Sequence, residues 1–145
     1  MDAILDVRNV QKALGQGAAR QTIIGDLTFR ARPGEFLSVV GPSGCGKTTL
    51  LMCLAGLYGV DAGSVSFEQQ EVKAPPAGMS VVFQDYSRSL LPWKNNLDNV
   101  VFGMKRVAAP AERKQAKARE LLQAVGLAGY ETHFPWQVSG GMQQA

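Results

Sequence analysis

The chain has 145 residues, of which 46% are hydrophobic, enough for one domain with a real core. Fifteen basic and 12 acidic residues give a net charge of +3 without a long single-sign run, so the composition does not indicate nucleic-acid binding. No apolar run approaches the roughly 20 residues of a membrane-spanning helix, and residues 1–3 lack the basic start of a signal peptide. The two cysteines have no metal-ligand spacing, so we expect a cytoplasmic protein.

The first part of the chain predicts strands. Apolar and polar residues alternate from Ala3 to Val10 and again from Thr22 to Ala31, with a glycine-rich turn between the two segments. Pro33-Gly34 is a strong turn signal. The continuous apolar run from Phe36 to Val40 that follows predicts a strand buried on both faces.

A glycine-rich loop comes next and leads into a helix. Gly41, Gly46, Lys47 and Thr48 match the P-loop pattern G-x-x-x-x-G-K-[ST], with the strand before and the helix after that the motif needs. Glycines let backbone N–H groups curl into an anion-binding nest, and the helix presents its unpaired N–H groups and its positive dipole end. The sequence therefore predicts a triphosphate site. Its candidate residues are Gly41, Pro42, Ser43, Gly44, Cys45, Gly46, Lys47, Thr48 and Thr49.

Two of these residues have individual roles in the prediction. Lys47 supplies a point charge for the β- and γ-phosphates. Thr48 supplies a hydroxyl to Mg²⁺, which prefers oxygen ligands. The alternative is a strand-to-helix turn that matches the motif by accident, and the correct flanks disfavour it.

Further elements follow the loop. Leu50, Leu51, Leu54 and Leu57 recur at helical spacing and predict a helix from residue 47 to 57 that packs on a sheet. Ser64 to Phe67 is a short predicted strand, as is Met79 to Phe83, which delivers Gln84 at its C-terminal end. Ligands bind beyond such strand ends in open α/β sheets, so Gln84 is a candidate site residue.

After Gln84 the pattern becomes helical. Asn95 to Met104 predicts one helix, and a second begins with Pro110 as its first residue and stops at Gly126. We therefore divide the chain into residues 1–84, a nucleotide-binding α/β core with an antiparallel β portion, and residues 85–145, a helical subdomain.

The order and spacing of Gly41 to Thr48, Gln84 and Val138 to Gln144 carry a resemblance. The sequence resembles the ATP-binding subunit of an ABC transporter, and Leu90 to Val100 is similar to its nitrate, sulfonate and taurine importer branch. The fold class implied is α/β. It is a P-loop NTPase (ABC ATPase) core with an N-terminal antiparallel β portion and a helical subdomain, incomplete at the C-terminus.

The resemblance implies roles for several residues. ATP and Mg²⁺ would be the cofactors, with Thr48 and Gln84 near the metal, and Gln84 would be the catalytic Q-loop glutamine that touches Mg²⁺ and the attacking water. Ser139, Gly140 and Gly141 would be the signature that closes over ATP on the P-loop of a second copy, in a head-to-tail dimer. Asp85 to Trp93 would receive a transmembrane permease subunit.

The same resemblance places the chain in a larger assembly. It would lie on the inner face of the cell membrane as a peripheral subunit, with a periplasmic solute-binding protein as an indirect partner. The solute would be nitrate, a sulfonate or a taurine-like anion. Independently, the Ser139 hydroxyl and the two glycines after it form a second anion-binding corner, although such a tripeptide alone is usually a loop. Pro92 and Trp93 fit either an exposed partner surface or a buried subdomain core.

Two departures from the family pattern matter. The family has an adenine-stacking aromatic residue where this chain has Leu14, so we expect weaker or less selective nucleotide binding. In the family, an aspartate, the catalytic glutamate and a histidine follow the signature, whereas nothing follows Ala145 here. His133 precedes the signature and is read as a loop or packing residue. We therefore expect ATP binding without hydrolysis from this chain alone, and two buried strands that lack neighbours.

Two other functions are weighed against this one. A nucleotide-binding or interaction module without turnover, from a truncated gene, remains an alternative. A P-loop GTPase or small-molecule kinase would need an Asn-Lys-x-Asp motif for recognising the base. The segment Asn95-Asn96-Leu97-Asp98 does not match this motif at its second position.

Overall fold

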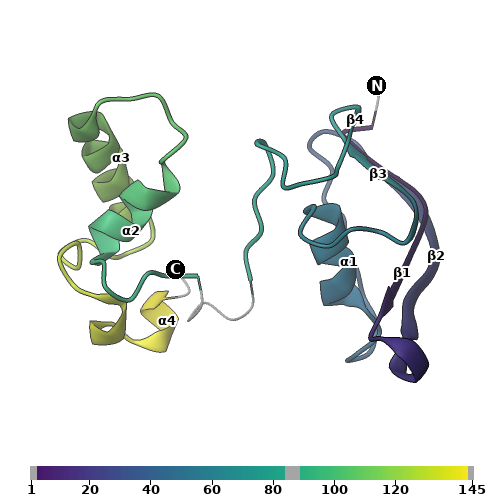
Figure 1. The fold of residues 1–145 in the computed structure, drawn as a ribbon. Helices are drawn as coiled ribbons and strands as arrows, with labels where there is room; N and C mark the ends of the chain where they lie inside the picture. The colour runs from purple at the N-terminus through teal and green to yellow at the C-terminus, as the bar shows by residue number, and fades with distance from the viewer. Residues whose placement is uncertain (1–2, 84–88, 144–145) are drawn as a thin grey trace. The chain divides into compact units, whose positions relative to one another are not determined.

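A computed structural model describes residues 3–83 and 89–143 of the chain. It divides into two compact units, Met1–Val81 and Val82–Ala145. Unit 1 is coloured purple to teal in Figure 1, and unit 2 is coloured green to yellow. Within the described ranges, no helix is both long and apolar enough to cross a membrane.

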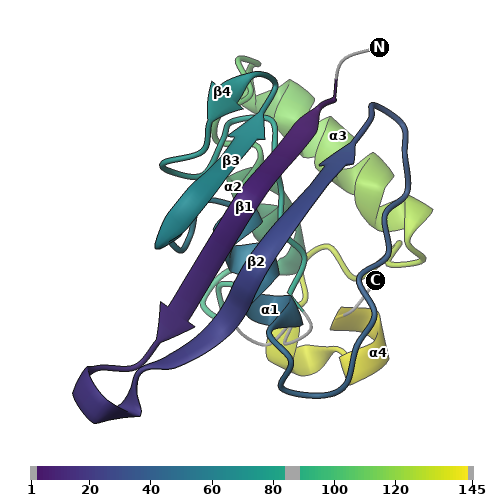
Figure 2. The same ribbon diagram turned by 90° about the vertical axis from the view of Figure 1, so that its right-hand side faces the viewer.

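Unit 1 is built on an antiparallel sheet with the strand order β2-β1-β3-β4. The strands are β1 (Leu5–Leu14), β2 (Gln21–Ala31), β3 (Ala62–Phe67) and β4 (Gln70–Glu71). Figure 2 shows β1 beside β2, with the short 3-10 helix η1 (Gly17–Ala19) at the end they share. The alternation predicted two of these strands correctly. Val7 and Val10 are both fully buried although they are three residues apart, because the register shift between them, where Asn9 has a φ of 47°, turns both to the inner face.

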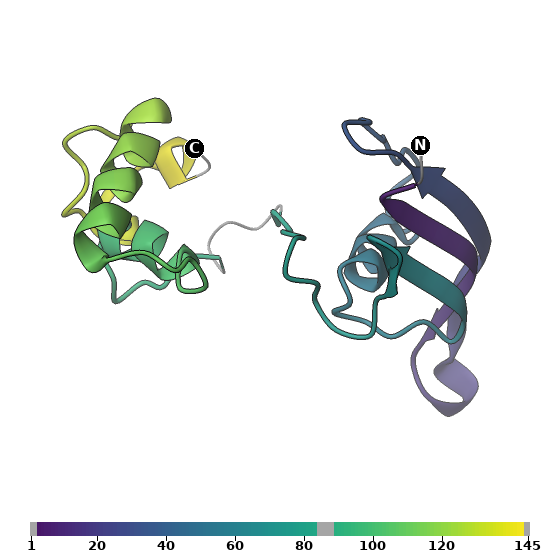
Figure 3. The same cartoon turned by 90° about the horizontal axis from the view of Figure 1, so that it is seen from above.

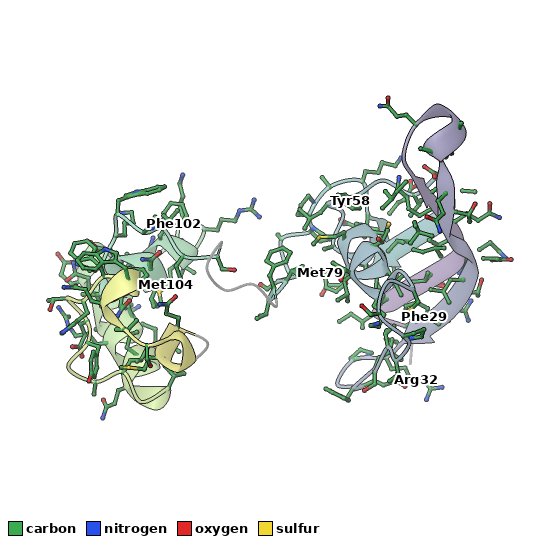
Figure 4. All side chains as sticks on the ribbon, turned by 90° about the horizontal axis from the view of Figure 1, so that it is seen from below. Phe29, Arg32, Tyr58, Met79, Phe102 and Met104 are labelled. Carbon is green, nitrogen blue, oxygen red and sulfur yellow. The ribbon has the colours of Figure 1, made fainter. Side chains whose placement is uncertain are left out.

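The helix α1 (Lys47–Leu54) covers one face of the sheet (Figures 1 and 3). The core between them consists of Val7, Val10, Ile24, Leu50, Cys53, Leu54 and Val65. Phe29, labelled in Figure 4, packs against this cluster. Two predicted core residues, Leu51 and Leu57, are instead 49% and 48% exposed. The helix is shorter than predicted because Gly56 takes the left-handed φ of 69° that ends helices.

Two predicted buried strands do not form. Phe36 to Val40 and Met79 to Phe83 are not strands, and Phe36, Val40 and Val82 are more than 90% exposed, at 92%, 92% and 95%. A parallel strand needs neighbours that take up its backbone hydrogen bonds. None of the sheet pairings among the described residues supplies one. The prediction of two buried strands is therefore wrong here.

Unit 2 is helical. It contains α2 (Asn96–Gly103), α3 (Ala111–Ala124), the 3-10 helix η3 (Pro135–Gln137) and the single turn α4 (Gly140–Gln143). Asn95 caps α2 by accepting a hydrogen bond from the Asp98 backbone N–H at 2.7 Å. Pro110 is the N-cap of α3 and not its first helical residue, because its ψ of 153° is outside the helical region. Gly126, at a φ of 78°, follows the last turn as predicted.

Candidate functional site

The phosphate loop has a shape that requires glycine at its C-terminal end. Gly46 has a φ of 97°, and a Cβ there would stand 2.7 Å from Ile23 Cγ2 on β2. A Cβ on Gly41 would stand 2.7 Å from Cys45 Sγ. The loop is thus tightly curled, and its C-terminal end packs against the sheet. Such a curl is the backbone conformation that aims N–H groups at an anion.

The Lys47 side chain folds back over this loop. Its Nζ donates hydrogen bonds to the carbonyl oxygens of Gly41 at 2.8 Å and Pro42 at 2.7 Å, and lies 3.8 Å from Cys45 Sγ. An ammonium group has three donors, and the contact with sulfur is the weakest of the three. The positive charge therefore stays at the loop, and one donor is available to a stronger acceptor such as a phosphate oxygen.

These residues fit a nucleotide and its metal. Thr48 is exposed in the first turn of α1, within the anion-binding end of an eight-residue helix. The described residues hold no group of three or more His, Cys, Asp or Glu side chains arranged for a metal ion. The Thr48 hydroxyl is an oxygen ligand of the kind that Mg²⁺ prefers.

The signature residues belong to unit 2, whereas residues 41–49 lie together in unit 1. Ser139, Gly140 and Gly141 are all exposed. The Ser139 Oγ accepts a hydrogen bond from the Met142 N–H at 3.4 Å, and Gln143 Nε2 donates to the carbonyl oxygens of Pro135 at 2.8 Å and Val138 at 3.1 Å. Local hydrogen bonds thus hold the signature turn in an accessible position.

The predicted permease-facing segment is described only in its last part. Gln84 lies outside the described residues, as do residues 85–88, so their roles stay predictions. Trp93 is 71% exposed, and its neighbour Pro92 is exposed as well. Of the two interpretations that the sequence left open for this pair, the structure supports the exposed one.

Asn99 of α2 holds the loop that presents Trp93. Its Nδ2 donates to the carbonyl oxygens of Leu91 at 3.1 Å, Lys94 at 3.0 Å and Asn95 at 3.1 Å. Its Oδ1 accepts from the Leu91 N–H at 2.8 Å. Sequence reasoning missed this residue. The available signal was an asparagine, a poor helix former, inside a predicted helix.

Three further residues have surroundings that bear on the sequence analysis. His133 is partly buried, and its ring centroid lies 5.0 Å from that of Tyr130, as expected of a packing residue. Leu14, at the position of the family's aromatic residue, ends β1 and is 38% exposed. Burial raises the pKa of the Cys53 thiol, so this cysteine acts as a core residue of α1.

Comparison with known proteins places the chain in a family. Residues 24–145 match the family model described as ABC transporter. This chain belongs to the ABC transporter family. It is 41% identical over 144 residues to an uncharacterized ABC transporter ATP-binding protein of Methanocaldococcus jannaschii, covering 99% of this chain and 53% of that relative. It is 43% identical over 119 residues to a taurine import ATP-binding protein of Yersinia pestis, covering 82% and 46%.

A solved structure of an ABC cassette matches the fold. A dimeric post-hydrolysis state of an ATP-binding cassette, bound to ADP and Pi, superposes with a TM-score of 0.80 at 27% identity, over 97% of this chain and 65% of that one. The prediction of the family and of the P-loop NTPase fold class is thereby confirmed. The chain spans about half the length of the curated ABC relatives it matches.

Proposed function

We propose that the protein is the ATP-binding subunit of an ABC-type importer, and that it couples ATP binding and hydrolysis to the uptake of a taurine-like sulfonate or nitrate anion. The observation that carries the proposal is the phosphate loop, with Gly46 packed against Ile23 and the Lys47 ammonium held over the loop carbonyls. The relative named for taurine import supports the choice of solute class.

In this proposal the loop N–H groups and Lys47 bind the phosphates of ATP, and the Thr48 hydroxyl would hold Mg²⁺. The metal, when bound, neutralises charge on the phosphates. Gln84 orients the attacking water. Residues 1–84 form the nucleotide-binding part, and residues 85–145 form the helical subdomain that carries the signature.

The proposal also includes a dimer and a permease contact. Ser139 to Gly141 of a second copy close the site in a head-to-tail dimer, and the matching cassette structure, itself a dimer bound to ADP and Pi, supports this arrangement. A permease subunit docks on the segment Asp85 to Trp93, where the exposed Trp93 supplies an apolar contact. The subunit works on the cytoplasmic face of the membrane, and the periplasmic solute-binding protein contacts only the permease.

Solute uptake in cells tests this function. Cells in which the gene is disrupted are expected to lose uptake of labelled taurine, an alkanesulfonate or nitrate. The wild-type gene restores that uptake, and a Lys47→Ala gene does not. A Lys73→Ala gene serves as the control, because Lys73 is an exposed lysine of the same unit that pairs with Glu71. Unchanged uptake of all three anions after disruption would contradict the proposed function.

A further inference from the structure

One carboxylate outside the phosphate loop holds the end of the β1–β2 hairpin. Asp61 Oδ2 accepts a hydrogen bond from the Ala13 backbone N–H at 2.7 Å, and its Oδ1 accepts from Lys12 Nζ at 3.2 Å. The Asp61 backbone N–H in turn donates to the Gln11 carbonyl oxygen at 2.9 Å. Arg20, across the hairpin, lies 3.5 Å from Oδ2. Asp61 thus clamps residues 11–13 directly before Leu14.

The Asp61 contact is needed because β1 has a partner strand on only one side here. On the β2 side its last residues stay paired, Ala13 with Thr22, although the register shifts at Val10, at Lys12 and again at Ala13. On the β3 side the pairing ends at Gln11 and Ala62, so the Asp61 carboxylate takes the place of a strand partner for the Ala13 N–H. The side chains of Lys12 and Asp61 are only 15% and 33% exposed, so solvent screens this pair less than a fully exposed one.

The clamped hairpin end lies beside the phosphate loop. Ala13 pairs with Thr22 and Lys12 with Ile24, and between these two partners lies Ile23, against which Gly46 packs. Figure 2 shows β2 running past α1 toward the hairpin end. A nucleotide held by its phosphates at the loop must extend its ribose and base beyond the loop, and this hairpin end is an adjacent surface of unit 1.

We propose that Asp61 is a positioning residue for nucleotide binding, which holds the backbone of residues 11–14 so that Leu14 presents its apolar side chain to the base. The proposal rests on the proposed function, because it needs a nucleotide at the phosphate loop. In this proposal Asp61 contributes to recognition of the base and does not contribute to binding of the phosphates. Base recognition and phosphate recognition should therefore respond differently to its removal.

Calorimetric titrations of the 145-residue chain with MgATP and with inorganic tripolyphosphate test this. Asp61→Ala is expected to weaken ATP binding about fivefold, the order of one lost apolar contact, and to leave tripolyphosphate binding unchanged. Asp61→Asn is expected to retain most of the ATP affinity, because its amide oxygen still accepts from the Ala13 N–H. Asp26→Ala is the control for the removed charge, since Asp26 lies on β2 and accepts only from Asn9 among the hydrogen bonds described.

A double-mutant cycle with Leu14 sharpens the test. Leu14→Ala is expected to weaken ATP binding by a similar factor, and the double variant is expected to bind no worse than either single variant, because both changes remove the same contact. The role of Asp61 is overturned if Asp61→Ala weakens both ligands equally, if it weakens neither, or if the two losses add. Failure of tripolyphosphate to bind the wild-type chain would instead refute the proposed function.

Discussion

The phosphate loop and the signature turn both combine glycines with a hydroxyl side chain, yet they are held differently. Gly46 packs against the sheet and Leu50, one turn further on, is buried in the core, so the phosphate loop is fixed by the interior of unit 1. The turn from Ser139 to Gly141 is exposed and is followed by only one helical turn, tied down by the Gln143 side chain.

This difference fits the proposed roles, in which the phosphate loop binds ATP and the signature turn of a second copy completes the site. A loop whose shape is fixed before the ligand arrives binds with a smaller ordering cost. The phosphate loop meets that condition, whereas the signature turn has few groups with which to hold an anion alone. The comparison agrees with the proposal that ATP binds to the P-loop of one copy and that the signature of another copy closes over it.

The largest expected effect concerns the charge at the phosphate loop. Lys47→Ala removes the ammonium that lies over Gly41 and Pro42, and is expected to weaken ATP binding about 100-fold or more. Titration with a fluorescent ATP analogue measures this, with Lys73→Ala as the matched lysine control. Undiminished ATP affinity in a folded Lys47→Ala variant would contradict the P-loop assignment.

The shape of the loop gives the second prediction. Gly46→Ala is expected to lower the free energy of unfolding by about 3 kcal/mol, because it adds left-handed backbone strain to a clash with Ile23. Gly44→Ala is the matched control. Gly44 also has a positive φ, 79°, but its Cβ would meet nothing within 4 Å, so strain alone should cost about 1 kcal/mol. Chemical denaturation measures both, and equal losses would mean that Gly46 does not pack against Ile23.

The third prediction separates unit 2 from the phosphate loop. Asn99→Ala removes the side-chain partner of the Leu91 N–H and of the Lys94 carbonyl oxygen, and is expected to destabilise unit 2 by about 2 kcal/mol. The Leu91 and Asn95 carbonyl oxygens still accept from the Lys94 and Asn99 backbone N–H groups. Both tryptophans, Trp93 and Trp136, belong to this unit, so their fluorescence follows its unfolding in denaturant. ATP affinity should stay at the wild-type value, and a matching loss of ATP affinity would show that the P-loop is not held by unit 1 alone.

A smaller effect, a gain in ATP affinity, is expected from a change at Leu14, the residue that we propose contacts the base. Leu14→Tyr introduces the aromatic ring that the family resemblance implies at this position, and is expected to tighten ATP binding about fivefold through stacking on adenine. Affinity for tripolyphosphate, which has no base, should not change. A fluorescent-ATP titration that shows no gain for this variant would argue against a base contact at Leu14.

The smallest effect is a pH dependence of stability. The Ala13 backbone N–H, followed by Lys12, holds the pKa of Asp61 below its ordinary value of 3.8, and Arg20 acts in the same direction. A lowered pKa in the folded state stabilises the protein above the unfolded pKa, and this contribution disappears as the pH falls through the folded pKa. The difference in stability between the wild type and Asp61→Asn should therefore be constant near neutral pH and shrink below pH 3.8. A difference that persists in strong acid would contradict the charge argument.

Patterns of neighbouring residues predicted those elements that do not depend on distant parts of the chain. Alternation predicted β1 and β2, and motif spacing predicted the phosphate loop at the start of α1. The run from Phe36 to Val40 has the composition of a buried strand, but a strand also needs partners, and composition does not supply them. Asp61 was missed for a similar reason, because it is 48 residues away from the Ala13 N–H that it holds. Such a contact becomes visible only in the folded chain.

The central claim is that unit 1 recognises a nucleotide through its triphosphate at the loop between Gly41 and Lys47. Competition against a fluorescent ATP analogue bound to the 145-residue chain, with Mg²⁺ present, tests it most directly. We predict that inorganic tripolyphosphate displaces the analogue, because it offers the loop N–H groups and Lys47 the same anion, and that AMP does not at the same concentration. Displacement by AMP together with no displacement by tripolyphosphate would contradict the claim.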